Sequence, residues 1–173
     1  MNTLFDLTGR KAIVTGAAQG LAYSMAEGLM ESGAEVAVID ISDRTVEVAR
    51  EFCGRGFRCH GIQADLSRID ELEGVFSRAV DALGGLDIIV NGAGVQRRYR
   101  SEEFPTEEWD FVINVNLNSV WKLCQLAGRH FLENGGGKII NIASMLSFLG
   151  GYTVAAYAAS KGGVAQLTKA LSN

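Results

Sequence analysis

Short, nearly continuous runs of apolar residues alternate along the chain with segments whose apolar residues recur every three or four positions. The continuous runs are typical of strands buried on both faces, and the periodic segments are typical of amphipathic helices. The runs expected to form strands are 11–16, 35–40, 57–63, 86–91 and 138–143. The segments expected to form helices are 21–33, 44–54, 67–85 and one long helix within 105–137.

This alternation predicts right-handed β-α-β units and a parallel sheet with helices on both faces. The expected fold class is therefore α/β, a doubly wound Rossmann-like parallel sheet, in a single domain over residues 1–173. In such a sheet, ligands bind beyond the carboxyl ends of the strands. The residues that follow each expected strand are thus the first candidates for a site.

Composition excludes several function classes. The 173 residues are 47% hydrophobic, with 21 glycines and one proline, which suits a domain with a core rather than a disordered chain. A formal net charge of -4 gives no support for nucleic-acid binding, and no apolar run approaches the roughly 20 residues that span a membrane. The N-terminus lacks the apolar stretch of a signal peptide, and the odd number of cysteines predicts reduced thiols in a cytoplasmic protein. Because Cys59 and His60 lack partners at ligand spacing, no metal site is predicted.

The stretch TGAAQGLA (15–22) follows the first expected strand. Gly16 permits a tight turn, and Gly20 opens a helix whose free N–H groups favour a pyrophosphate. An acid about 20 residues further on, Asp40, completes a dinucleotide-binding pattern, although a helix-capping role is the alternative. Its carboxylate would accept hydrogen bonds from the ribose hydroxyls of adenosine and repel a 2′-phosphate. A basic residue at position 19 could bind that phosphate, but this position holds the uncharged Gln19. NAD is therefore predicted in preference to NADP.

Four further motifs follow beside the expected strand ends: NGAG (91–94), Asn116, Ser144, and YAASK (157–161). Each of them has an ordinary structural explanation when it is taken alone. Together with the glycine turn, they resemble the short-chain dehydrogenase/reductase family, which has a TGxxxGxG turn, an NNAG strand end and an Asn–Ser–Tyr–Lys tetrad. The resemblance extends from about residue 5 to the last residue. It implies an oxidoreductase with the strand order 3-2-1-4-5.

The chemistry of the tetrad can be argued from the residues. Tyr157 and Lys161 lie four apart in an alanine-rich helix, and therefore on one face. A phenol is normally protonated at neutral pH, and an ammonium one turn away favours the phenolate, which can take a proton from an alcohol. Ser144 would hydrogen-bond the same substrate oxygen. The resemblance adds that Lys161 holds the nicotinamide ribose and that Asn116 anchors a water in a proton relay, which makes all four residues catalytic candidates.

The resemblance also implies which residues bind the cofactor. Asp65 and Leu66 would border the adenine, and Asn91 would steady its strand. The full predicted set is Gly16, Gln19, Gly20, Leu21, Asp40, Asp65, Leu66, Asn91, Gly92, Ala93, Tyr157 and Lys161. The chain departs from the family motifs at Ala22, where a third glycine is usual, and at Gly92, where the second asparagine of NNAG is usual. Both departures are expected to be tolerated.

Two segments, GVQRRYRSEEFPTEEWDFVINVNLNSV and NIASMLSF, are similar to a narrower group, the 2-dehydro-3-deoxy-D-gluconate 5-dehydrogenases and gluconate 5-dehydrogenases. Arg97 and Arg98 follow the fourth expected strand, where a guanidinium can pair with a sugar-acid carboxylate or simply face solvent. Substrate binding is therefore assigned to Arg97, Arg98, Ser144 and Tyr157. The predicted activity interconverts a secondary alcohol and a ketone on a sugar acid, with NAD. A reductase of another carbonyl substrate, such as 3-oxoacyl groups, and a non-catalytic nucleotide-binding module are the alternatives.

The chain ends at LTKALSN, without a glycine or proline to stop the last expected helix. By resemblance, full-length relatives continue with further strands and form homo-oligomers, usually tetramers. We therefore expect a chain truncated before the last strands, with one edge of the sheet uncovered and with weak NAD binding.

Overall fold

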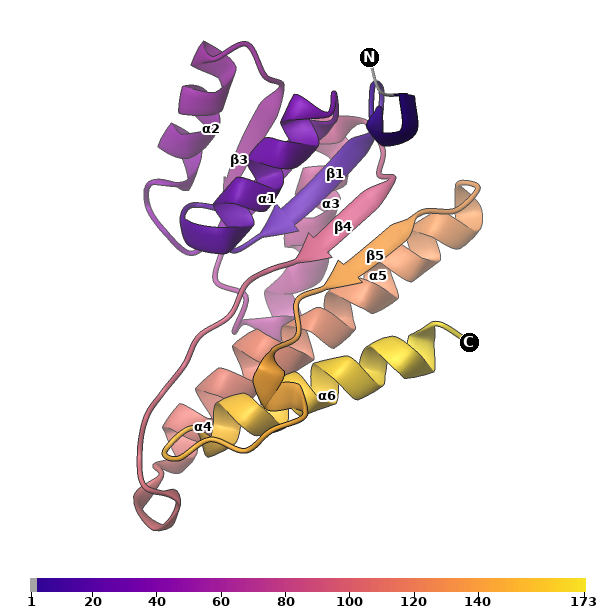
Figure 1. The fold of residues 1–173 in the computed structure, drawn as a ribbon. Coiled ribbons are helices and arrows are strands. Elements are labelled where there is room, and N and C mark those ends of the chain that lie inside the picture. The colour runs from indigo at the N-terminus through magenta and orange to yellow at the C-terminus, as the bar shows by residue number, and fades with distance from the viewer. Residues whose placement is uncertain (1–2) are drawn as a thin grey trace.

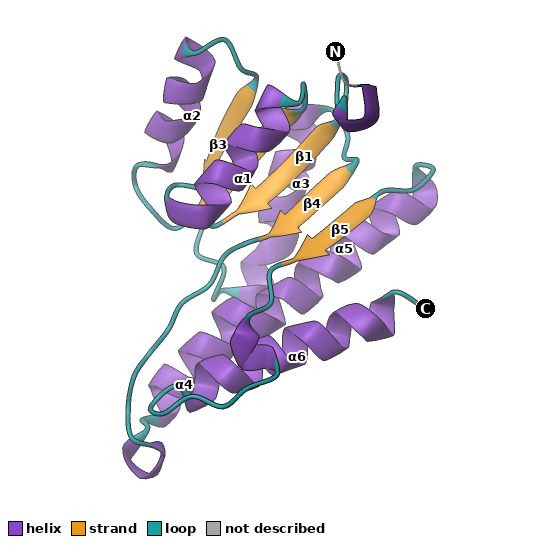
Figure 2. Cartoon of the chain, in the orientation of Figure 1, coloured by secondary structure: helices purple, strands orange, loops and turns teal. Residues whose placement is uncertain are grey.

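The computed structural model describes residues 3–173 as a five-stranded parallel sheet with helices on both faces (Figures 1 and 2). The strands are β1 (Lys11–Thr15), β2 (Glu35–Asp40), β3 (Cys59–Gln63), β4 (Ile88–Asn91) and β5 (Lys138–Asn141). The helices are α1 (Gly20–Glu31), α2 (Thr45–Gly54), α3 (Leu72–Leu83), α4 (Thr106–Ile113), α5 (Ser119–Glu133) and α6 (Ala155–Leu171). The spatial order β3-β2-β1-β4-β5, parallel throughout, confirms the predicted doubly wound fold and strand order.

The core has two apolar layers because successive strand residues point to opposite faces of the sheet. Val14 and Val38 pack in the layer beneath α1 and α2, whereas Ile13 and Ile39 pack in the layer formed with α3 and α5. Figure 1 shows α1 and α2 on one side of the sheet, and α3 and α5 on the other. A smaller cluster around Val164 joins α6 to α5. These layers fix the strand ends, and hence the residues that follow them.

The segment predicted as one long helix is helical throughout 106–133, but it contains a π-helical turn that the prediction did not include. Helix α4 ends at Ile113, a π-helical turn covers Asn114–Asn118, and α5 begins at Ser119. A π-turn is rare and often lies at a functional site. Here the buried Asn116 amide bonds to the loop after β4, a contact between distant segments that helical periodicity does not reveal.

The two outer strands, β3 and β5, have no further strand beside them within residues 3–173. On β5 the side chains of Lys138 and Ile140 are exposed, with Ile140 at 47%. Among the described helices, none is long and apolar enough to cross a membrane.

Candidate nucleotide-binding and catalytic site

The glycine turn joins β1 to α1 through two residues in the left-handed region, Gly16 (φ +73) and Gly20 (φ +65). A Cβ at Gly16 would lie 2.6 Å from Ala93 Cα, so only glycine lets the turn approach the end of β4 this closely. A Cβ at Gly20 would meet no atom within 4 Å, because the start of α1 faces open space. The unpaired N–H groups of a helix N-terminus are therefore accessible to an anionic ligand.

A cavity of about 400 Å³ lies at the carboxyl ends of the strands. It is lined by nine of the predicted cofactor residues: Gly16, Gln19, Gly20, Leu21, Asp40, Asp65, Leu66, Gly92 and Ala93. Apolar residues that carry no sequence motif, such as Ile41 and Val115, complete the wall. Asn91 does not line the cavity; it is buried, and its Nδ2 donates to Asn141 Oδ1 across β4 and β5 (2.8 Å).

The Asp40 carboxylate is fixed at the end of β2, opposite the glycine turn. Its Oδ2 accepts a hydrogen bond from the Ala18 N–H (3.0 Å), and its Oδ1 accepts one from the Ser42 N–H (3.1 Å). Among the described residues that line the cavity, none is lysine, arginine or histidine. The charged groups of the cavity wall, Asp40 and Asp65, are both acidic, which disfavours an additional phosphate.

The Asn116 side chain ties the loop after β4 to helix α6. Its Oδ1 accepts from the Val95 N–H (2.8 Å), while its Nδ2 donates to the Val95 carbonyl (2.9 Å) and to Ser160 Oγ (3.1 Å). Ser160 Oγ in turn donates to the Tyr157 carbonyl (2.8 Å). The amide therefore positions the backbone near Tyr157.

Lys161 is buried one turn beyond Tyr157, and its side chain adjoins the same phenol ring. The Nζ atom lies 5.9 Å from the centroid of the Tyr157 ring and donates to the Ile142 carbonyl (2.6 Å). Nζ is also 3.7 Å from the position that a Cβ would take at Gly94, a residue of the cavity wall. Burial lowers the pKa of the Lys161 ammonium, because the charged form loses hydration. Lysine and tyrosine thus share one face of α6 beside the cavity.

Ser144 caps the 3₁₀ turn Met145–Ser147, where its Oγ accepts from the Leu146 N–H (3.2 Å). The Ser147 hydroxyl accepts from the Ser144 N–H (3.1 Å) and donates to the Lys161 carbonyl (2.7 Å). Ser147 therefore connects the segment after β5 to α6. It was missed in the sequence, although the Ser-x-x-Ser spacing of a capping box was a signal for it.

The two candidate substrate arginines have different environments. Arg97 Nε donates to Glu108 Oε2 (2.7 Å), and the guanidinium carbon lies 4.9 Å from the centroid of the Phe111 ring. Arg98 is exposed, and no ion pair is formed by it within residues 3–173. The next residue, Tyr99, donates its N–H to the Thr153 carbonyl (3.0 Å). The loop is thus anchored at Arg97 and Tyr99, and the side chain of Arg98 between them remains exposed.

The two departures from the family motifs contact each other. A Cβ at Gly92 would lie 3.0 Å from Ala22 Cβ and 2.8 Å from the Thr15 carbonyl oxygen. The methyl group of Ala22 therefore occupies space that the absent side chain of Gly92 leaves open. This packing explains why the chain accommodates both residues in the wall of the cavity.

Comparison with known proteins identifies the class. A family model described as short chain dehydrogenase matches residues 10–173, and the chain belongs to that family of oxidoreductases. Over 170 residues it is 44% identical to the 2-dehydro-3-deoxy-D-gluconate 5-dehydrogenase of Escherichia coli, covering 98% of this chain and 67% of that relative. It is 39% identical to the 5-keto-D-gluconate 5-reductase of Escherichia coli, covering 99% of this chain and 68% of the relative.

A solved structure has the same fold. The gluconate 5-dehydrogenase of Burkholderia cenocepacia, in complex with NADP and tartrate, matches with a TM-score of 0.91 at 36% identity. The match covers 96% of this chain and 66% of that one.

No group of three or more histidine, cysteine, aspartate or glutamate side chains suited to a metal ion is present among residues 3–173. Cys53, Cys59 and Cys124 are free thiols.

Proposed function

We propose that this chain carries the catalytic face of an NAD-dependent dehydrogenase that interconverts a secondary alcohol and a ketone on a sugar acid. The observation that carries the proposal is the Tyr157–Lys161 pair beside a cavity lined by the glycine turn and Asp40. The dehydrogenases and the reductase of sugar acids among its relatives support the substrate class.

The residues fit a nicotinamide dinucleotide. The space beside Gly20 leaves room for a pyrophosphate at the start of α1, and the close contact of Gly16 with Ala93 shapes the floor beneath it. Asp40 stands where ribose hydroxyls would donate to a carboxylate. When bound, the cofactor exchanges a hydride with the carbinol carbon of the substrate.

The protein's own groups handle the proton. Tyr157 accepts the hydroxyl proton of the alcohol during oxidation and returns it to the ketone during reduction. The buried Lys161 ammonium favours the phenolate, because charges interact more strongly in a medium of low dielectric constant. Ser144 donates a hydrogen bond to the substrate oxygen as negative charge develops there. Asn116 and Ser147 hold the segments that carry these groups.

NAD is proposed rather than NADP because the wall of the cavity contains acids and no described basic residue. The gluconate 5-dehydrogenase of Burkholderia cenocepacia contains NADP, so this preference rests on Asp40 and its surroundings in this chain. A homo-oligomer is proposed as well. Trp109 and Trp121, which are 37% and 46% exposed on α4 and α5, support such an interface.

The proposed activity is tested with a panel of substrates assayed with NAD and with NADP. We expect hydride transfer with aldonates and keto-aldonates, a preference for NAD, and little turnover of neutral polyols or 3-oxoacyl compounds. A preference for 3-oxoacyl groups would contradict the sugar-acid substrate. NAD binding without turnover of any substrate would instead favour a nucleotide-binding module.

The arginine loop provides a sharper test of the substrate class. Arg98→Ala is expected to raise KM for an aldonate about 10- to 100-fold, because a charge-assisted bond to the carboxylate is lost. KM for a neutral polyol should change less than threefold. Arg97→Ala serves as the matched control: it removes the pair with Glu108, and should affect both substrates alike. Equal losses in the Arg98 variant for charged and neutral substrates would argue against a carboxylate contact.

A further inference from the structure

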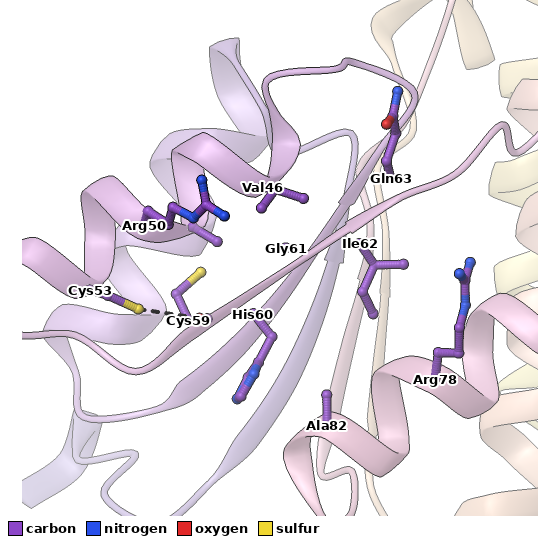
Figure 3. A pocket seen from close by; sticks show the side chains of 11 residues that line it. Val46, Arg50, Cys53, Cys59, His60, Gly61, Ile62, Gln63, Arg78 and Ala82 are labelled. Atoms are coloured by element: carbon purple, nitrogen blue, oxygen red, sulfur yellow. Dashed lines mark hydrogen bonds between the residues drawn. The ribbon is translucent and has the colours of Figure 1, made fainter.

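The outer edge of β3 forms a groove that is separate from the nucleotide site (Figure 3). A cavity of about 540 Å³ runs along the strand between helices α2 and α3. We call it the β3 groove and define it by Arg50 and Cys53 of α2, Gly61 and Gln63 of β3, and Arg78 of α3. None of its lining residues also lines the nucleotide cavity.

Unpaired main-chain groups line the floor of the β3 groove. In a parallel pair, alternate residues direct both their N–H and their C=O groups toward the neighbouring strand. The Ala64 N–H donates to the Asp40 carbonyl of β2 (2.8 Å), which fixes the register. Gly61 and Gln63 therefore direct their main-chain groups outward, where no strand of the described chain pairs with them. This edge has the donors and acceptors to hold an added strand.

The two walls of the groove carry positive charge. Arg50 on α2 and Arg78 on α3 lie on either side of the strand, and both are exposed (Figure 3). Neither forms a hydrogen bond or an ion pair with any side chain of residues 3–173, and no aspartate or glutamate lines the groove. Since the whole chain has a net charge of -4, this pair of arginines is opposite in sign to the net charge of the chain. Charge complementarity therefore favours an acidic ligand.

The two walls of the groove lie on opposite faces of the sheet, with α2 on one face and α3 on the other. Helix α2 packs so closely on β3 that a Cβ at Gly61 would lie 2.6 Å from the Thr45 carbonyl oxygen. Successive side chains of a strand point to opposite faces. An added strand would therefore direct its side chains alternately toward the α2 wall and the α3 wall, where Arg50 and Arg78 stand.

We propose that the β3 groove binds an extended acidic peptide segment as a sixth strand of the sheet. Main-chain hydrogen bonds form with Gly61 and Gln63, and carboxylates pair with Arg50 and Arg78. A second copy of this chain is a poorer occupant, because antiparallel pairing of two β3 edges about a two-fold axis brings like charges together. Burial raises the pKa of the Cys59 thiol to about 12, so this thiol stays protonated at neutral pH.

The proposal is tested by fluorescence anisotropy with three labelled octapeptides. One repeats Glu-Glu-Val-Val twice, so that adjacent glutamates face both walls. The second has lysine in place of glutamate, and the third carries proline at two adjacent valine positions, one of which must direct its backbone nitrogen toward β3. We expect the glutamate peptide to bind, the lysine peptide not to bind, and the proline peptide to bind at least tenfold more weakly because proline cannot donate to a strand ladder. The double variant Arg50→Ala/Arg78→Ala should lose about tenfold in affinity.

A charge swap and a matched control complete the test. Arg50→Glu/Arg78→Glu should transfer the preference from the glutamate peptide to the lysine peptide, whereas Arg129→Ala, an exposed arginine on α5, should change nothing. The proposal is overturned if no peptide binds, if the charge swap leaves the preference unchanged, or if the proline peptide binds as well as its parent. NAD titration of every variant reports on an intact fold, and on the nucleotide site independently.

Discussion

Replacing Tyr157 by phenylalanine is expected to lower kcat by about 10²- to 10⁴-fold, the usual contribution of a general acid–base group. The hydroxyl is the atom that exchanges the substrate proton in the proposed reaction, and it is the only atom that the substitution removes. The ring remains, with its neighbour Lys161 at 5.9 Å from the centroid. Binding of the dinucleotide should therefore change little, which is measured by titrating NADH fluorescence in parallel with steady-state turnover.

Tyr152→Phe is the matched control for this prediction. Tyr152 lies five residues before Tyr157 and is 80% exposed, so loss of its hydroxyl should leave kcat within about twofold of the parent. If the Tyr157 variant keeps a similar kcat, the proton passes through another group, and the proposed mechanism fails.

The second large effect is expected at Asp40. Asp40→Asn keeps the shape of the side chain but removes its charge, so hydrogen bonds from ribose hydroxyls weaken and repulsion of a 2′-phosphate disappears. The ratio of kcat/KM for NAD to that for NADP should fall about 10- to 100-fold, the range for a bond to a charged group. It is measured by initial rates with each cofactor at a fixed concentration of sugar acid.

A stability control is needed for this variant, because Asp40 also accepts hydrogen bonds from Ala18 and Ser42. Asp70→Asn, an exposed acid before α3, serves as the matched charge change. Thermal unfolding of both variants separates a loss of fold from a change in cofactor preference. An unchanged cofactor ratio in a folded Asp40 variant would show that the preference is determined elsewhere.

The parts of the site that could be predicted from the sequence are those in which a motif and a strand end coincide. The turn around Gly16 and the acid Asp40 each follow a short apolar run, and the parallel topology brings both to the same cavity. The strand cores were predictable for a similar reason, since burial on both faces produces continuous apolar runs. The ends of the strands were less predictable: the run 86–91 forms a strand only over Ile88–Asn91.

The remaining features depend on contacts between distant segments. The π-turn at Asn114–Asn118 is linked to the bonds that Asn116 makes with Val95, 21 residues earlier. The difference between Arg97 and Arg98 in the loop after β4 arises from Glu108 on helix α4. Neighbouring identical residues have the same local propensity, so only the folded chain distinguishes them.

The contact between Ala22 and Gly92 makes two distant motifs a single unit for engineering. A graft that introduces asparagine at position 92 from a relative inserts a side chain against both the alanine methyl and the Thr15 carbonyl. A graft that introduces only glycine at position 22 leaves a gap behind the first turn of α1. Chimaeras of this enzyme should therefore exchange both motifs together, since each half has a matching shape only in its own parent.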